Sequence, residues 1–278
     1  RHHDAKGLPT IVLGRTGVRV PRMALGTGSN FMRIASDAQA AQLLGAALDK
    51  GFYFWDTCSR YGSQPRIGQV LKTRRQEVFL ASGSDARTVE AAKRSLEKTL
   101  SELQTDHLDL YQIDSVTDAN DVRGWEATGL YAQMVKWKEE GVVRFIGISG
   151  RTSASAMKVA AERYDFDTLR TSLRTSAPNQ DTSEQAIPAA AGRGMGVMIS
   201  KVFQPQEKIV RLSGDDLIRY GLSLEHVHVA VVGIDSASVL AKNEQVLHRF
   251  KQMSPAELQG MHVALASFFR PGLTATFG

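Results

Sequence analysis

The sequence predicts an α/β fold, a (β/α)8 barrel, and three observations support it. Short apolar segments with strand character alternate with amphipathic helical patterns roughly every 24 to 36 residues, the length of one strand–loop–helix unit. Eight such strands can be counted, and barrels of this kind commonly form one domain of about 250 residues. The chain has 278 residues, without a linker or low-complexity segment. We expect a single domain over residues 1–278; the eightfold count disfavours the alternative, a doubly wound sheet.

The individual elements follow from periodicity and capping residues. Residues 10–22 predict an N-terminal hairpin, two short strands around a glycine-containing turn. The predicted barrel strands are 23–25, 53–57, 78–82, 108–114, 144–149, 168–173, 196–202 and 227–233. The predicted helices are 36–48, 88–103, 129–140, 153–163, 184–192, 215–222 and 238–250. Ser254, Pro255 and Glu257 form a helix start, so residues 254–278 should add a C-terminal helix and tail.

Composition and charge exclude several function classes. The net charge is +5, but the basic residues are scattered, so no nucleic-acid partner is expected. No apolar segment approaches the roughly 20 residues of a membrane span, so we expect neither a membrane span nor a leader. Cys58 is the only cysteine, which favours a buried packing thiol and a reducing cytoplasm. The histidines lack metal-ligand spacing, so we expect no metal, and we expect a monomer.

In such a barrel, the chemistry lies at the carboxyl ends of the strands. The apolar run before Asp56 ends at this acid, and Tyr61 follows five residues later, so a carboxylate and a phenol should face one cavity. Side chains alternate along a strand, so Asp114 shares a face with Gln112 and should point into the same mouth. Arg170 shares a face with Arg174, and whether that face points inward stays open.

Several segments, in this order and spacing, carry a resemblance to a known family. They are 13–17, 24–28, Asp56-Thr57 with Tyr61-Gly62, 67–68, 103–112, 144–149 and 233–243. Over nearly its whole length, the chain resembles the aldo-keto reductases. The resemblance implies NADPH-dependent carbonyl reduction by a tetrad of Asp, Tyr, Lys and His. In that tetrad the Tyr donates a proton, the Lys lowers the Tyr pKa, the Asp holds the Lys and the His orients the carbonyl.

The chain keeps half of this tetrad. Asp56 and Tyr61 match, but Gly83 stands at the Lys position and Asp114 at the His position. Without the Lys, we expect nothing to lower the Tyr61 pKa, and we expect Asp56 to lose its counter-charge. With Asp114 close by, one of the two carboxylates should have a raised pKa.

The substrate side also departs from the family, whereas the cofactor side is better kept. Gly83, Ser84, Arg151, Arg174 and Ser200 are expected to form a rebuilt site, by divergence or by engineering, for a small and potentially anionic molecule. For either arginine, a salt bridge to Asp114 is an equal alternative. By resemblance, the residues that contact NADP(H) are Gly26, Thr27, Ser149, Lys201, Ser236, Lys242 and Asn243, and Lys242 would attract a 2′-phosphate unless it is a solvated surface lysine.

Three functions remain open from the sequence. The first is an aldo-keto-reductase-like enzyme that binds NADP(H), with impaired or altered carbonyl reduction. The second is a non-redox proton-transfer catalyst, an eliminase, lyase or isomerase, in which Asp114 is the general base and Tyr61 or a rim arginine stabilises the developing negative charge. The third is a ligand sensor that has kept only the nucleotide site.

Overall fold

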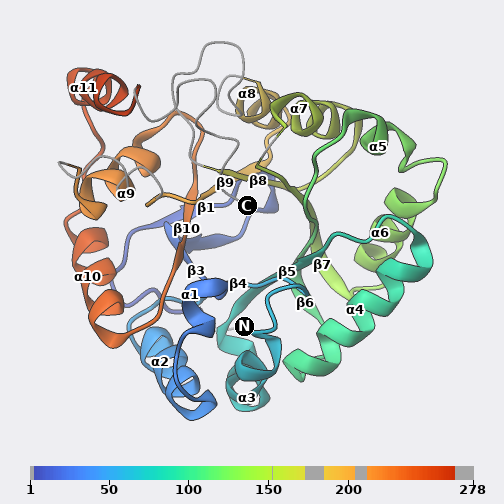
Figure 1. The fold of residues 1–278 in the computed structure, drawn as a ribbon, viewed down its shortest axis with the longest axis horizontal. Helices are drawn as coiled ribbons and strands as arrows, with labels where there is room; N and C mark the ends of the chain where they lie inside the picture. Colours follow the sequence, from blue (N-terminus) through green and yellow to red (C-terminus); the bar gives the residue numbers. More distant parts are fainter. Residues whose placement is uncertain (1–2, 152, 173–184, 204–211, 267–278) are drawn as a thin grey trace.

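The computed structural model describes residues 3–151, 153–172, 185–203 and 212–266. Eight parallel strands close into a barrel in the order β10-β3-β4-β5-β6-β7-β8-β9, and helices surround it (Figure 1). The strands are β3 Met23–Gly26, β4 Phe54–Asp56, β5 Phe79–Ser84, β6 Leu108–Ile113, β7 Val143–Ser149, β8 Thr168–Ser172, β9 Gly196–Ser200 and β10 Val229–Gly233. The predicted (β/α)8 barrel is confirmed.

The helices lie on the outside of the barrel. They are α1 Ser29–Met32, α2 Asp37–Asp49, α3 Gln64–Arg74, α4 Val89–Leu103, α5 Ala119–Gly124, α6 Leu130–Glu139, α7 Ala154–Arg163, α8 Ala186–Gly192, α9 Gly214–Ser223, α10 Ala237–His248 and α11 Pro255–Leu265. The sequence pattern missed α3, because Pro65 and Gly68 have low helix propensity and obscure its periodicity. The C-terminal helix was predicted correctly: in α11, Ser254 and Glu257 form a reciprocal capping box.

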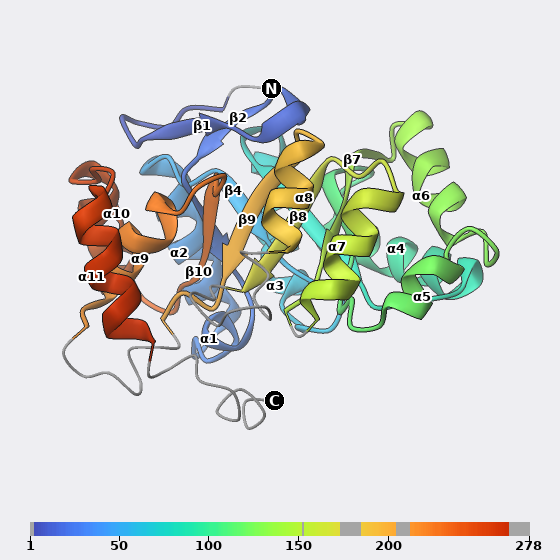
Figure 2. The ribbon, with the colours of Figure 1, turned by 90° about the horizontal axis from the view of Figure 1, so that it is seen from above.

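The predicted N-terminal hairpin closes one end of the barrel. Strands β1 (Thr10–Val12) and β2 (Arg19–Pro21) pair antiparallel, and the intervening 3-10 turn ends at Gly17 with φ 68°. Leu13 is fully buried, and a side chain at position 196 would lie 2.6 Å from its Cγ, so Gly196 permits this close packing. The hairpin lies at the opposite end from α1, which follows the carboxyl end of β3 (Figure 2).

Two buried acids, Asp109 and Asp167, each hold together the amino ends of two neighbouring strands, and we call them the Asp109 and Asp167 clamps. Asp109 in β6 accepts hydrogen bonds from the Leu80 N–H at 3.0 Å and from Arg75 at 2.9 Å. Just before β8, Asp167 accepts from the Ile146 N–H at 2.9 Å and from Lys138. Each carboxylate is compensated by a cation and a backbone donor, as burial of a charge requires.

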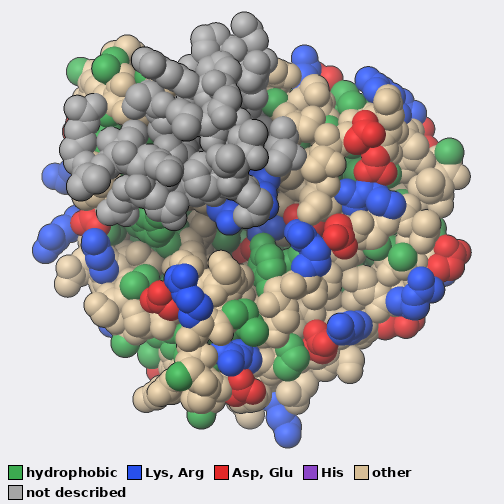
Figure 3. Space-filling model, viewed as in Figure 1, with side chains coloured by type: hydrophobic (Ala, Val, Ile, Leu, Met, Phe, Trp, Pro, Cys, Tyr) green, Lys and Arg blue, Asp and Glu red, His purple; other side chains and the backbone are tan. Residues whose placement is uncertain are grey.

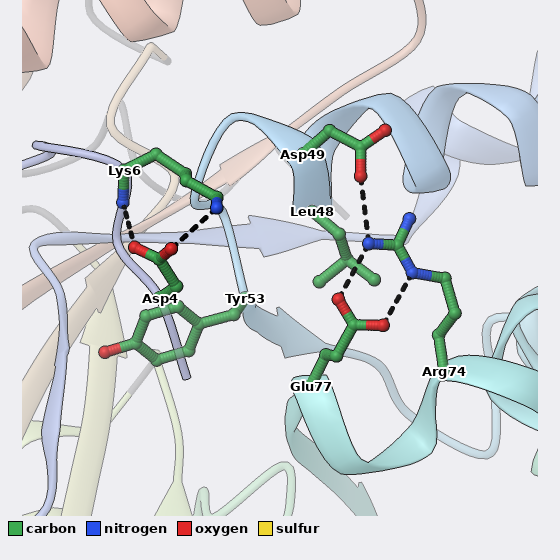
Figure 4. Close-up of a pocket in the computed structure, with 7 residues that line it drawn as sticks. All are labelled: Asp4, Lys6, Leu48, Asp49, Tyr53, Arg74 and Glu77. Carbon is green, nitrogen blue, oxygen red and sulfur yellow. Dashed lines mark hydrogen bonds and ion pairs between the residues drawn. The ribbon is translucent and has the colours of Figure 1, made fainter. Parts of the chain in front are cut away.

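A small pocket of about 110 Å³ also lies at the amino end (Figure 4). Its lining residues are Asp4, Lys6, Leu48, Asp49, Tyr53, Arg74 and Glu77. The charged groups pair with one another: Lys6 with Asp4 at 2.6 Å, and Arg74 with both Glu77 and Asp49. In this fold the amino end contributes to stability rather than to chemistry, so we look for the active site at the other end.

Candidate active site

Asp56 is the last residue of β4, and its carboxylate lies buried inside the barrel mouth. One oxygen pairs with the Arg170 guanidinium, and the other accepts a hydrogen bond from Gln112 Nε2 at 3.3 Å. The Asp56 backbone carbonyl also accepts from Thr27 Oγ1 at 3.0 Å, which joins the ends of β3 and β4. Asp56 is therefore buried beside a cation and a neutral donor.

Asp114 follows β6 directly and faces the same interior, as strand alternation predicted. Its Oδ2 accepts from Arg60 Nη2 at 2.5 Å and from the Cys58 thiol at 3.1 Å. Its Oδ1 lies 3.5 Å from Arg170 Nη2. Two carboxylates thus share one buried arginine, and Asp114 has further donors of its own.

Arg170 lies in the middle of β8 and points into the barrel, which answers the question that the sequence left open. Its side chain is 7% exposed, and it contacts three other elements. One Nη pairs with Asp56 of β4, the other with Asp114 after β6, and Nε donates to Ser149 Oγ of β7 at 3.0 Å. The expectation that Asp56 loses its counter-charge is therefore wrong, because Arg170 supplies one from across the barrel.

The two carboxylates have opposite pKa shifts. Burial raises the pKa of Asp56 to about 6, since it outweighs the attraction of Arg170 and is assisted by the Asp114 charge. Burial also acts to raise the pKa of Asp114, but Arg170, Arg60, Cys58 and Ser149 together hold it well below its ordinary value. One raised pKa was expected for the pair, and it belongs to Asp56.

Tyr61 lies in the loop after β4, where its N–H donates to the Cys58 carbonyl at 3.0 Å. A Cβ at Gly28 would lie 3.7 Å from Tyr61 Cζ, so the ring packs against the end of β3. The Arg170 charge lowers the pKa of Tyr61, whereas burial and the charges of Asp56 and Asp114 raise it, and the net shift is upward. The pKa of Tyr61 is therefore not lowered overall, as expected without the Lys, although Arg170 acts to lower it.

Gly83 lies in β5, at the position where the resemblance led us to expect a lysine. A Cβ built there would lie 2.7 Å from the backbone oxygen of Gln112 on β6. Real Cβ atoms do not approach a carbonyl oxygen so closely, so any side chain at position 83 requires the two strands to shift. Glycine at position 83 therefore permits the observed spacing of β5 and β6.

Ser84 was predicted to contact substrate, and in the structure its side chain lies on the outer side of β5. Its hydroxyl accepts from the Tyr111 hydroxyl at 3.1 Å, and Tyr111 packs against Trp137 of α6 on the outside of the barrel. Strand alternation places Ser84 on the face opposite to Gly83, so it points away from the mouth.

The remaining predicted substrate residues lie at the rim. Arg151 is exposed beyond β7, and its carbonyl accepts from Ser172 Oγ at 3.4 Å. Ser200 ends β9 and donates to the Thr171 carbonyl at 3.2 Å. Arg174 lies outside the described residues. Arg60 was not predicted as a site residue, yet it pairs with Asp114 and lies 3.6 Å from Asp85.

The predicted cofactor residues are spread around the mouth. Gly26 ends β3, and Thr27 is buried, with its hydroxyl on the Asp56 carbonyl and 3.3 Å from Ser63 Oγ. Lys201, just past β9, is exposed and has φ 60°.

Three further cofactor candidates lie on or beside α10. Ser236 caps this helix by accepting from the Val239 N–H at 3.3 Å. Lys242 is exposed and 3.6 Å from Asp215. Asn243 is buried, and its Nδ2 has no hydrogen-bond partner among the described residues. An unpaired buried donor of this kind is a candidate for a ligand contact.

The face that carries the carboxyl ends of the strands is shown in Figure 3. Lys and Arg side chains lie directly beside Asp and Glu side chains near the middle of this face. Among the described residues, no cluster of three metal-ligating side chains is present. Within the same residues, the helices are too short or too polar to span a bilayer.

Comparisons with known proteins agree on one family. A sequence model described as "Aldo/keto reductase family" matches residues 22–205. The Bacillus subtilis oxidoreductase YrpG is 33% identical over 216 residues, 67% of this chain and 64% of that protein. A D-threo-aldose 1-dehydrogenase of a Pseudomonas species is 24% identical over 67% of each chain. The chain thus spans about two thirds of the length of these relatives.

Solved structures show the same fold. The holo form of an aldo-keto reductase from Bacillus halodurans superposes with a TM-score of 0.77 at 18% identity, over 92% of this chain and 96% of that one. An aldo-keto reductase from Klebsiella pneumoniae, solved in complex with NADPH, has a TM-score of 0.74 at 20% identity and covers 95% of this chain and 96% of its own. From the family match and the relatives together, this chain belongs to the aldo/keto reductase family, a family of oxidoreductases.

Proposed function

We propose that this chain binds NADP(H) and reduces a carbonyl group of a small, anionic molecule, at a rate and with a specificity altered by its rebuilt mouth. The observation that carries the proposal is the grouping of Asp56, Tyr61 and Arg170. A phenol that packs at the mouth, within the field of a buried cation and beside a carboxylate, can donate a proton to a carbonyl oxygen. When bound, NADPH would supply the hydride for the carbonyl carbon.

The residues at the cofactor positions fit such a nucleotide. The unpaired Asn243 Nδ2 is a buried donor, and Ser236 and Lys242 lie on the same helix segment. Ser149 Oγ accepts from Arg170 and hydrogen-bonds Asp114, which leaves one lone pair for an amide N–H. A solved family neighbour in complex with NADPH supports the same choice of cofactor.

Two rim cations support an anionic substrate. Arg151 is exposed, and the Arg60 side chain is 45% exposed, so both can meet a substrate carboxylate or phosphate. We also propose a cytoplasmic monomer: the only cysteine is a buried free thiol, and the large exposed apolar side chains of the described residues, Val12, Met32 and Val263, are scattered.

Binding and catalysis can be tested separately. Quenching of tryptophan fluorescence by NADPH should give saturable binding, and Asn243→Ala should weaken it about tenfold, whereas Asn120→Ala on distant α5 should not. Carbonyl reduction should then be lost in Tyr61→Phe without loss of binding. Absence of NADPH binding would contradict the proposal and leave the cofactor-free alternative. Binding without reduction of any carbonyl in a broad panel would favour the ligand sensor.

A non-redox proton-transfer catalyst is the second candidate, favoured by the raised pKa of Asp56. A base with a pKa near 6 can accept a proton at neutral pH, whereas the lowered pKa of Asp114 makes it a weak base. This weighs against Asp114 as the general base. A cofactor-free proton-exchange activity that survives Asp114→Asn and is lost in Asp56→Asn would support this reading.

A further inference from the structure

We propose that Arg170 is the positioning residue of this site: from β8 it supplies the cation that β5 cannot supply, and it readies the phenol of Tyr61 to give up its proton. The reaction itself rests on the proposed function, but the electrostatic role of Arg170 can be measured without cofactor or substrate. The same arrangement makes Asp114 an opposing charge that weakens the effect of Arg170.

The first step is steric. The phenol lies at the end of β3 and β4, and the adjacent strand on one side is β5. A side chain at position 83 of β5 would collide with the backbone oxygen of Gln112 at 2.7 Å. The neighbouring inward position of β5, Ala81, is apolar and fully buried. Strand β5 therefore offers no cation to the mouth, and the charge must come from elsewhere.

The second step is the geometry of Arg170. The guanidinium is held by a carboxylate of β4, a carboxylate after β6 and a hydroxyl of β7, so it has little freedom to move. Asp56, Asp114 and Ser149 contact the guanidinium, and Tyr61 and Cys58 interact with its charge. Arg60 and Gln112 bind the two carboxylates beside it. Burial also leaves Arg170 poorly screened by water, unlike Arg60, which is 45% exposed. Arg170 is thus the cation with the stronger field at this site.

The third step concerns the charge that develops. When the Tyr61 O–H bond breaks, its proton forms a new O–H bond on the substrate oxygen, and a negative phenolate remains. Arg170 stabilises that phenolate, and its charge has the largest single influence on the pKa of Tyr61. Burial acts in the opposite direction, as do the charges of Asp56, Cys58 and Asp114, and together they outweigh the Arg170 charge and leave the pKa of Tyr61 raised.

These opposite signs define the experiment. The chain has six tyrosines, so the phenol of Tyr61 is followed by its 13Cζ chemical shift, assigned as the signal missing from Tyr61→Phe. Arg170→Gln should raise the pKa of Tyr61 by about 1 to 3 units, because a nearby cation is lost. Arg170→Lys, which keeps the charge, should return it to within about one unit of the parent protein. Asp114→Asn should lower it, because an opposing charge is removed.

The outcomes that overturn the proposal are equally defined. It fails if Arg170→Gln leaves the pKa of Tyr61 unchanged, if Arg170→Lys titrates like Arg170→Gln, or if Asp114→Asn raises the pKa. A purely structural role of Arg170 would not give shifts of opposite sign for the two variants. Should Arg170→Gln not fold, the same change is made in an Asp56→Asn background, which removes the unpaired carboxylate, and it is compared with Asp56→Asn alone.

Failure of this inference is distinguishable from failure of the proposed function. NADPH binding to the parent protein is measured in parallel by fluorescence quenching. If the parent protein binds NADPH but the pKa of Tyr61 does not change in Arg170→Gln, the role of Arg170 is contradicted and the proposed function stands. A Tyr61 shift without NADPH binding would support the role of Arg170 and contradict the proposed cofactor.

Discussion

At the scale of single residues, the chemistry of this site depends on how one buried arginine is shared between two acids. Among the described residues, Asp114 has three further side-chain donors besides Arg170, whereas Asp56 has only Gln112, and this difference separates their pKa values. The sequence identified both acids, but it could not show how the arginine and the other donors are divided between them. Arg170 lies more than a hundred residues from Asp56 in sequence, and period-two alternation does not say which face of a fully buried strand points inward. The signal available in the sequence was Arg170 itself, a charged residue inside a strand that is predicted to be buried. Such residues are rarely buried without a charge partner.

The Asp56 shift predicts a dependence of stability on pH. The folded-state pKa of about 6 lies above the ordinary 3.8, so the folded state binds more protons between these values. The free energy of unfolding should therefore fall as the pH rises from about 4 to about 7, by about 3 kcal/mol from this group. Denaturant titrations at several pH values measure this free energy. The parent protein should show the fall with rising pH, and Asp56→Asn should lack it. Parallel pH profiles of the two proteins would contradict the raised pKa.

Gly83 gives a steric prediction. Gly83→Ala should destabilise the chain by about 1 to 3 kcal/mol, because its Cβ meets the Gln112 backbone oxygen. The matched control is Gly260→Ala in α11, where an added Cβ meets nothing within 4 Å, so a gain of about 0.5 to 1 kcal/mol is expected. Chemical denaturation measures both. Equal effects of the two substitutions would show that β5 and β6 can separate freely. If β5 and β6 cannot separate, the lysine in the double variant Gly83→Lys and Asp114→His will not fit, and this variant will not form an ordinary reductase site.

At the scale of elements, the strands were predictable because each is a short buried run between turn signals. Strands β5 to β9 begin and end within two residues of their predicted bounds. Helices with a clear apolar stripe and a capping residue were equally accessible, such as α4 behind Thr88. What the sequence could not supply was contact between elements: the hydrogen bond from the Tyr111 hydroxyl to Ser84, and the pairing of Asp109 with the N–H of the preceding strand. Both depend on register between strands, which a single sequence does not encode locally.

The Asp109 clamp yields a test at this scale. Asp109 is fully buried and holds both Arg75 and the Leu80 N–H, so Asp109→Asn leaves a buried cation without its charge partner. We expect a loss of about 3 to 5 kcal/mol in the free energy of unfolding. Asp106→Asn, three residues away and exposed, should cost less than about 1 kcal/mol. A small loss for Asp109→Asn would mean that water or another donor replaces the carboxylate.

At the scale of the whole molecule, the barrel separates the groups that stabilise it from the groups that react. The hairpin, the Asp109 and Asp167 clamps and the ion pairs of Figure 4 lie at the amino end of the strands. Asp56, Asp114 and Arg170 lie toward the carboxyl end. Along β6, the five steps from Asp109 to Asp114, the residue that follows the strand, span roughly 16 Å at about 3.3 Å per residue. The mouth can therefore change its charges while the amino end maintains the fold.

This separation predicts additive effects of substitutions at the two ends. Asp109 binds Arg75 and the Leu80 N–H, whereas Asp56 binds Arg170 and Gln112. The changes in unfolding free energy of Asp109→Asn and Asp56→Asn at pH 7 should therefore add to within about 0.5 kcal/mol in the double variant. Asp56→Asn and Asp114→Asn both contact Arg170, and they should instead deviate from additivity by about 1 kcal/mol or more. Denaturant midpoints of the single and double variants measure both cycles. Strong coupling between Asp109 and Asp56 would show that charge changes at the mouth are transmitted along the strands. In that case a rebuilt active site would need compensating changes throughout the barrel, and not only at its rim.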